Sequence, residues 1–146
     1  MGILDSIIGK DEKDDEVEQS VGKKSTNPFS ISVSFAPLRL SSNQKNSVNL
    51  MVKVKNTSPE NHLLSVDALL PRESMLGFEP SGINKAAEKR VGEIKSGQTM
   101  EIPITIWANN QTKPGNYNVD VTIYSHYIGY DKVLSYAKKN TYIRVV

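Results

Sequence analysis

Cysteine is absent from the 146-residue chain, which excludes thiol catalysis, disulfide bonds and cysteine-ligated zinc. Histidine is scarce, because only His62 and His126 are present and neither lies in a recognisable catalytic motif. No apolar run approaches the roughly 20 residues of a membrane-spanning helix, and the N-terminus lacks the basic region of a secretory signal. We therefore expect a cytoplasmic protein that is not an enzyme and holds no metal or cofactor.

Charge is divided unevenly along the chain. Residues 1–28 carry four basic and seven acidic side chains, whereas residues 29–146 carry 14 basic and nine acidic ones. The acidic tail at 1–28 either keeps the protein soluble or folds back loosely on the basic domain. The net charge of +5 on residues 29–146 is spread too thinly for a nucleic-acid surface, so we expect no nucleic-acid partner.

The first ten residues have the periodicity of a short amphipathic helix. The apolar side chains that would share one face of this helix include Ile3, Leu4, Ile7 and Ile8. A helix of this length is not stable alone in water, which leaves three interpretations: it docks on its own domain, lies on a membrane surface, or fills a groove of a partner protein. Residues 11–28 have two valines and no aromatic residue, which is typical of a flexible linker.

From Phe29 onward the pattern changes to the two-residue alternation of β-strands. Residues 84–90 fit either a short helix or an edge strand, and Pro103 places its strand at a sheet edge or a bulge. Seven strands are expected, or eight if a short one lies near Val91, because polar turns separate the segments 29–35, 38–40, 48–54, 64–70, 100–106, 117–123 and 141–146. This spacing predicts an all-β, antiparallel, immunoglobulin-like (fibronectin III-like) sandwich over residues 29–146.

Three motifs within residues 45–125 resemble immunoglobulin-like domains of the NEW3 and CARDB type. They are Val-Lys-Val-Lys-Asn-Thr at 52–57, Gly-Glu-Ile-Lys-Ser-Gly at 92–97, and Pro-Gly-Asn-Tyr at 114–117. The tyrosine at the start of the penultimate strand is a familiar device that locks a corner of such sandwiches. The resemblance implies an accessory domain, found beside enzymes or cell-surface modules and often exported, and it supplies no catalytic residue.

Residues 127–136 are expected to form an aromatic-rich connection before the last strand. Tyr127, Tyr130 and Tyr136, with lysines nearby, either cap the end of the sandwich or bind a partner. Our leading hypothesis is a non-catalytic protein-binding or scaffolding module that uses these tyrosines and the residues of the N-terminal helix. The alternative is an accessory domain that binds carbohydrate or a cell-surface polymer. Peripheral membrane contact through residues 1–10 is a further hypothesis.

Overall fold

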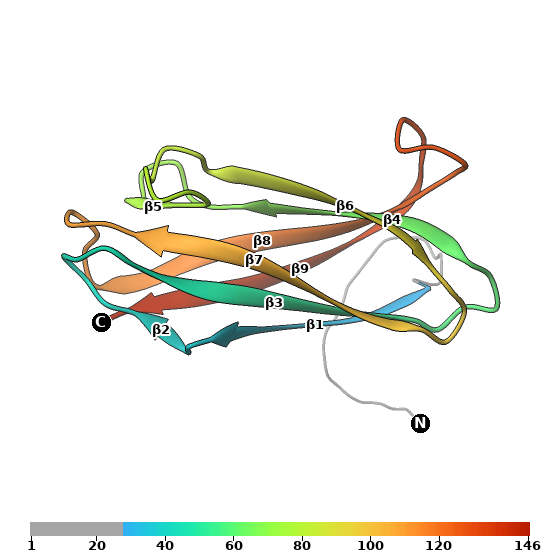
Figure 1. Ribbon diagram of the computed structural model, residues 1–146, viewed down its shortest axis with the longest axis horizontal. Coiled ribbons are helices and arrows are strands. Elements are labelled where there is room, and N and C mark those ends of the chain that lie inside the picture. Colours follow the sequence, from blue (N-terminus) through green and yellow to red (C-terminus); the bar gives the residue numbers. More distant parts are fainter. Residues whose placement is uncertain (1–27) are drawn as a thin grey trace, which may run out of the picture.

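The computed structural model describes residues 28–146, which form nine strands in two stacked sheets (Figure 1). No helix lies within this part of the chain, so none of its elements is a helix that could span a membrane. The strands are β1 (Phe29–Ala36), β2 (Arg39–Leu40), β3 (Asn46–Asn56), β4 (His62–Leu69), β5 (Leu76–Gly77), β6 (Ala86–Ile94), β7 (Thr99–Ala108), β8 (Gly115–His126) and β9 (Val133–Val145).

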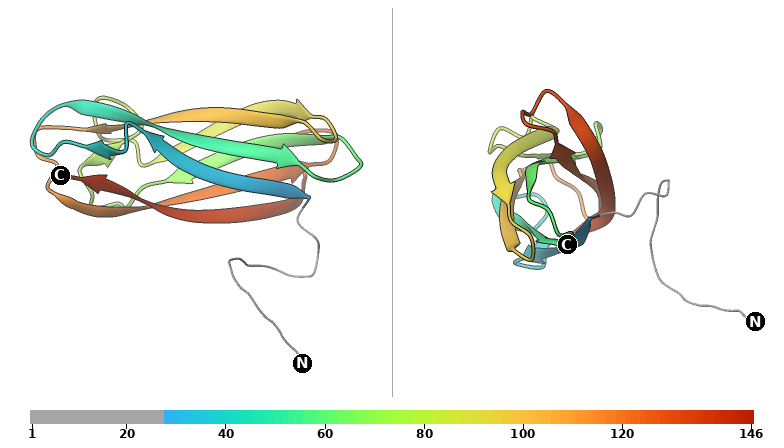
Figure 2. Two further views of the ribbon diagram at one scale, coloured as in Figure 1. Left: turned by 90° about the horizontal axis from the view of Figure 1, so that it is seen from below. Right: turned by 90° about the vertical axis from the view of Figure 1, so that its right-hand side faces the viewer.

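One sheet has the strand order β1-β3-β7-β5, and the other has the order β2-β9-β8-β4-β6. All pairs are antiparallel except β2 with β9, which run parallel. The segment β1–β2 contributes to both sheets, because β1 pairs with β3 and β2 pairs with β9. Figure 2 shows the two layers from the side and from one end, with β1 lying beside β9 at one margin.

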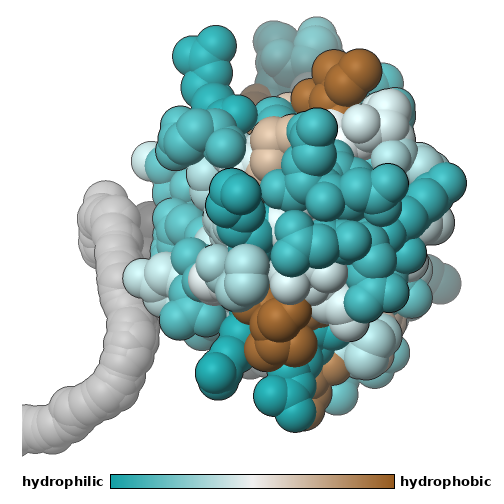
Figure 3. All heavy atoms as spheres, turned by 90° about the vertical axis from the view of Figure 1, so that its left-hand side faces the viewer, coloured by the Kyte–Doolittle hydropathy of each residue, from teal (hydrophilic) through white to brown (hydrophobic). Residues whose placement is uncertain are grey.

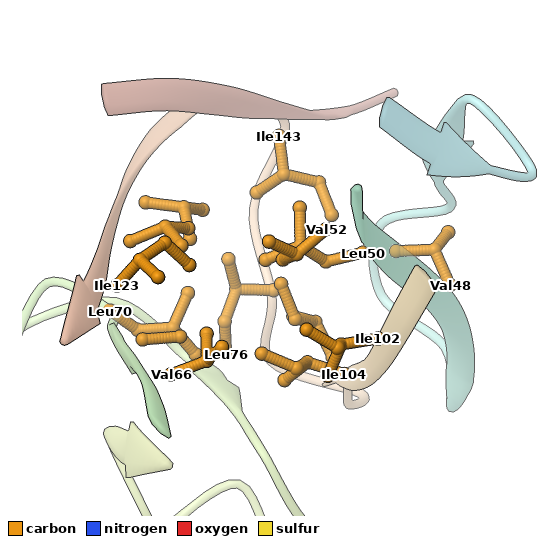
Figure 4. Close-up of a cluster of buried hydrophobic side chains, with 14 of the residues drawn as sticks. Val48, Leu50, Val52, Val66, Leu70, Leu76, Ile102, Ile104, Ile123 and Ile143 are labelled. Carbon is orange, nitrogen blue, oxygen red and sulfur yellow. The ribbon is translucent and has the colours of Figure 1, made fainter. Parts of the chain in front are cut away.

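The alternating apolar residues of the sequence fill the space between the sheets (Figure 4). On β3 the side chains of Val48, Leu50, Val52 and Val54 are buried, and the residues between them face outward. Inward-facing isoleucines of β7 and β8 and Ile143 of β9 complete the core. Burial of this apolar surface is the main favourable contribution to folding, so the alternation that predicted strands also identified the core.

The tyrosine expected to lock a corner does so. The Tyr117 hydroxyl at the start of β8 donates a hydrogen bond to the backbone carbonyl of Lys113, with 2.8 Å between the oxygens. This bond fixes the turn that precedes β8. Pro103 also lies at a free edge, as expected, because β5 pairs with β7 only at Trp107 and Ala108.

Several sequence-based expectations need correction. Nine strands replace the expected seven or eight, because the two-residue strand β5 is too short to show alternation. Of the two alternatives for residues 84–90, the edge strand is confirmed and the helix is wrong, since most of these residues belong to β6. The expected connection at 127–136 ends early, because β9 begins at Val133 rather than near residue 141. The amphipathic helix and the linker, including Ile3, Leu4, Ile7 and Ile8, lie outside the described residues.

Candidate functional site

Exposed hydrophobic side chains concentrate on the hairpin of β8 and β9. Of the large hydrophobic residues that are exposed in the described chain, six lie between residues 127 and 142. The exposed fraction reaches 84% for Ile128 and 62% for Tyr136. We call the following five the hairpin surface: Tyr127, Ile128, Val133, Leu134 and Tyr136. A concentration of this kind is a feature of interaction sites, whereas isolated exposed hydrophobic residues are normal.

A pocket of about 440 Å³ opens beside the hairpin surface. Tyr127, Ile128 and Leu134 line one part of it, and Leu63 of β4 adds a further apolar side chain. The remaining lining residues are polar or charged, and they are Glu60, Asn61, His62, Glu93 and His126. The hairpin surface therefore combines protruding side chains with a hollow, which is the shape that binding hot spots use.

The opposite end of the sandwich has a different character. Its exposed hydrophobic residues include Leu38 and Ile83, which are 77% and 79% exposed. Figure 3 views this end and shows separate hydrophobic patches surrounded by hydrophilic side chains. This end supplies positions for control substitutions, because these hydrophobic residues are at least as exposed as Tyr127 and Leu134 but are not grouped along one strand.

A row of ring contacts crosses the outer face of the five-stranded sheet. Its members, in spatial order, are Arg90, Tyr130, His126, Tyr124, Tyr136 and Lys138, and we call them the aromatic row. Successive ring centroids lie 5.1 to 6.2 Å apart, and the two cationic groups lie 5.0 and 6.0 Å from the terminal rings. Aromatic and cation–π contacts at these distances stabilise the arrangement. The strands β6, β8 and β9 and the 127–132 loop together build the row.

Two histidines that contact serine hydroxyls lie close to these surfaces. The Oγ of Ser65 is 2.7 Å from Nε2 of His126, and Nδ1 of His126 has no hydrogen-bond partner among the described residues. His62 bridges the hydroxyls of Ser58 and Ser125 at 2.9 Å each. Ser65 and Ser125 are buried, whereas Ser58 is half-buried. Within residues 28–146, no group of three or more histidine, aspartate or glutamate side chains is placed to hold a metal ion.

The aromatic row has a perturbed carboxyl group beside it. Burial raises the pKa of Asp67 on β4, and the negative charge of Glu88 on the neighbouring strand raises it further, while His126 partly offsets this. The pKa of the Tyr124 hydroxyl is also raised, first by burial and then by Asp67 and Tyr136. Both shifts arise because a negative charge is costly where water is partly excluded.

The tyrosines proposed from the sequence are placed differently from one another. Tyr127 and Tyr136 are exposed on the hairpin surface. Tyr130 is half-buried, because its ring packs against His126 and Arg90 and its hydroxyl accepts a hydrogen bond from the backbone N–H of Gly92. Tyr130 therefore holds the 127–132 loop against the sheet. Sequence reasoning missed Ile128, Val133 and Leu134, although exposed aliphatic residues flanking a glycine turn are a recognisable signal.

No family model matches the chain, and no curated protein matches it. Among solved structures, the native conformation of E. coli alpha-2-macroglobulin is similar over 89% of this chain and 7% of that chain, with 15% identity and a TM-score of 0.56. Bacteroides uniformis beta-glucuronidase 2 is similar over 80% of this chain and 13% of that chain, with 14% identity and a TM-score of 0.51. The FixG-related protein from Vibrio parahaemolyticus is similar over 82% of this chain and 98% of that chain, with 9% identity and a TM-score of 0.50.

These likenesses show an all-β, sandwich-like fold and nothing about activity, because all the identities are low. This chain spans only a small share of alpha-2-macroglobulin and of the glucuronidase, whereas it spans almost all of the FixG-related protein. The same fold is therefore found within large proteins and also as a structure of similar size.

Proposed function

We propose that this protein is a non-catalytic protein-binding module, and that the hairpin surface is where the partner docks. The observation that carries the proposal is the grouping of exposed Tyr127, Ile128 and Leu134 around a pocket. Tyrosine and large aliphatic side chains in such a setting contribute strongly to binding when a partner removes them from water. A short polar ligand would leave most of this apolar area exposed.

The backbone of β9 adds a second means of recognition at the same place. On its outer side, β2 pairs with β9 only at Arg144 and Val145. β1 lies beside β9 at this margin but does not pair with it, so no strand of the described chain pairs with residues 133–143 on that side. A free strand edge can accept an extended segment of another protein, and the flanking side chains then provide specificity. The hairpin surface begins at this edge.

The finer classification of the fold is also part of the proposal. The two-sheet strand order and the Tyr117 corner support an immunoglobulin-like, fibronectin III-like domain related to the NEW3 and CARDB type. The non-catalytic part of the proposal is supported by the burial of Ser65 and Ser125, two of the three serines whose hydroxyls contact a histidine. The hydroxyl of the third, Ser58, donates a hydrogen bond to Asn56 Oδ1.

The test is affinity capture from a native lysate with the full chain, followed by measurement of affinity for the captured protein. The Tyr127→Ser/Leu134→Ser variant should bind that protein at least about tenfold more weakly, because truncation of a buried interface anchor typically costs more than 1 kcal/mol. The control is Leu38→Ser/Ile83→Ser, which removes even more exposed residues at the opposite end. Equal binding by both variants would contradict the proposal.

A second candidate function rests on the aromatic row. Tyr136 is 62% exposed, and its ring lies next to Tyr124 and Lys138, an arrangement that supports stacking against the face of a sugar in an acidic carbohydrate polymer. Binding on a glycan array that Tyr136→Ala abolishes and Leu134→Ser leaves unchanged would favour this function over protein binding. The reverse dependence on captured protein would favour the hairpin surface.

A further inference from the structure

Basic side chains follow β9 along its exposed margin. We call the following five the basic stripe: Lys132, Lys138, Lys139, Arg144, and Arg39 of β2, which lies directly opposite Arg144. All five are exposed. Strand β9 itself contains no acidic residue, so its positive charge is not balanced along the strand.

Within the part of the chain that the structure describes, no acidic side chain forms an ion pair with a member of the stripe. The ion pair found there joins Arg90 to Glu88 on β6, at the other margin of the sheet. Asp120 on β8 accepts a hydrogen bond from Asn140 instead of approaching a lysine. Elsewhere a lysine does face an acid, as Lys53 on β3 lies opposite Glu101 on β7. The stripe is thus a region of unbalanced positive charge.

The same chain carries a segment of opposite charge. Residues 11–18 contain six acidic side chains and one lysine. This segment is followed by residues 19–28 and then by Phe29, the first residue of β1. Ten residues span at most about 35 Å when extended, which sets how far from Phe29 the acidic segment can reach.

Phe29 lies at the end of the sandwich where β9 begins. Its ring contacts His62 with 5.2 Å between centroids, and His62 contacts Ser125, which pairs with Ser135 of β9. Lys138 and Lys139 follow Ser135 by three and four residues, a distance of about 10 to 13 Å along a strand. The lysines of the stripe are therefore well within reach of residues 11–18.

We propose that the acidic segment at residues 11–18 binds the basic stripe of its own domain. Short tethering raises the effective concentration of the segment at the stripe, so even individually weak pairs of exposed charges act together. The proposal does not depend on the identity of any partner, because both members belong to this chain.

The test is carbodiimide cross-linking of the full chain, which joins carboxylates to lysine amines that are in contact, followed by mass spectrometry. Equal amounts of unlabelled and heavy-nitrogen-labelled protein are mixed, so that links within one molecule are told from links between two. We expect links from residues 11–18 to Lys138 and Lys139 within single molecules. They should decrease severalfold in about 1 M salt, where the Debye length is about 3 Å.

Lys55 provides a control for simple proximity. Lys55 belongs to β3 and lies opposite Ser30 of β1. It is therefore close to the point where the chain enters the fold, but it belongs to the other sheet. Links to Lys55 at the same yield as to Lys138 would overturn the proposal, as would links mainly between two molecules, which would indicate that a second copy occupies the stripe. Absence of links to the stripe would overturn it as well.

A charge variant distinguishes electrostatic attraction between the segment and the stripe from the effect of the connecting chain's length. Arg39→Glu/Arg144→Glu removes two arginines, which do not take part in the cross-linking reaction, and leaves both lysines in place. The yield of links to Lys138 and Lys139 should fall about threefold, because the attraction of exposed charges decreases while the tether is unchanged. An unchanged yield would overturn the proposal, and neither result depends on whether the hairpin surface binds another protein.

Discussion

The Tyr130 hydroxyl accepts a hydrogen bond from the backbone N–H of Gly92, with 2.9 Å between Oη and N. This contact joins the loop between β8 and β9 to the edge strand β6, which is separated from β9 by the two strands β8 and β4. Gly92 has a positive φ of 84° and lies where the register of β6 against β4 shifts. The hairpin surface therefore depends on an irregularity in a distant strand.

Removal of this bond should loosen the loop without unfolding the sandwich. Tyr130→Phe keeps the ring contacts with His126 and Arg90 but leaves the Gly92 N–H without its acceptor, at a cost of about 0.5 to 1.5 kcal/mol. Hydrogen exchange of the Gly92 amide should accelerate, and the free energy of unfolding should fall by this amount. Tyr142→Phe is the control, since Tyr142 is 64% exposed; equal effects of the two changes would contradict the prediction.

The raised pKa of Asp67 predicts how stability depends on pH. Because the folded pKa lies above the unfolded value of 3.8, the ionised carboxylate lowers stability at neutral pH. As the pH falls, the folded state takes up the proton at a higher pH than the unfolded state does. The loss of stability caused by the ionised carboxylate is therefore fully removed below the unfolded pKa. Asp67→Asn should therefore stabilise the protein slightly at pH 7.

The measurement is urea unfolding of wild type and Asp67→Asn at neutral pH and again below the unfolded pKa. The stability difference should be present at neutral pH and nearly absent in acid. Asp131→Asn removes one exposed charge from the 127–132 loop and controls for the change in net charge. A difference that grew as the pH fell would show that the carboxylate of Asp67 stabilises the fold.

Lys85 organises the irregular segment between β4 and β6. Its Nζ donates hydrogen bonds to the carbonyl oxygens of Ser74 at 2.8 Å, Gly82 at 2.9 Å and Leu76. Lys85→Met keeps the length of the side chain and leaves these carbonyls without the donor, so it should destabilise the protein by about 1 to 3 kcal/mol. Lys89→Met on β6 is an exposed control, and chemical denaturation of both variants provides the comparison.

Gly77 on β5 lies so close to the backbone of Gly82 that Gly77 has no room for a side chain. A Cβ at Gly77 would lie 2.6 Å from Cα of Gly82, so Gly77→Ala should cost about 3 kcal/mol or more through displaced backbone. Gly97→Ala is the control, because its Cβ would meet nothing within 4 Å and only its φ of 78° is unfavourable, at about 1 to 2 kcal/mol. Thermal unfolding should show the larger loss for Gly77→Ala.

Residues with strict alternation allowed their strands to be predicted. Val48 to Val54 gave a whole strand because every second side chain enters the core. The first half of β9 escaped prediction, because Val133 and Leu134 are both exposed and Lys138 and Lys139 follow each other at the sheet margin. An edge strand that faces water on several sides has no periodic apolar signal.

The aromatic row could not be predicted from the sequence for a different reason. Tyr124 and Tyr136 meet only because β8 and β9 pair in one particular register, and Arg90 joins them across β4. Register depends on the whole set of buried side chains and on turn geometry, and no local pattern of the sequence reports it. The tyrosines were found from composition, whereas the division into exposed and supporting tyrosines required the structure.

The pairing of distant strands also has a consequence for the time course of folding. Asn46 pairs with Ala108, and Arg39 of β2 pairs with Arg144 of β9. Large loops must close before such contacts form, and domains of this kind typically fold in milliseconds to seconds. During synthesis the margin formed by β2 and β9 cannot assemble until residue 145 has left the ribosome. Until then the apolar faces of the earlier strands remain exposed, which makes the incomplete chain prone to aggregation.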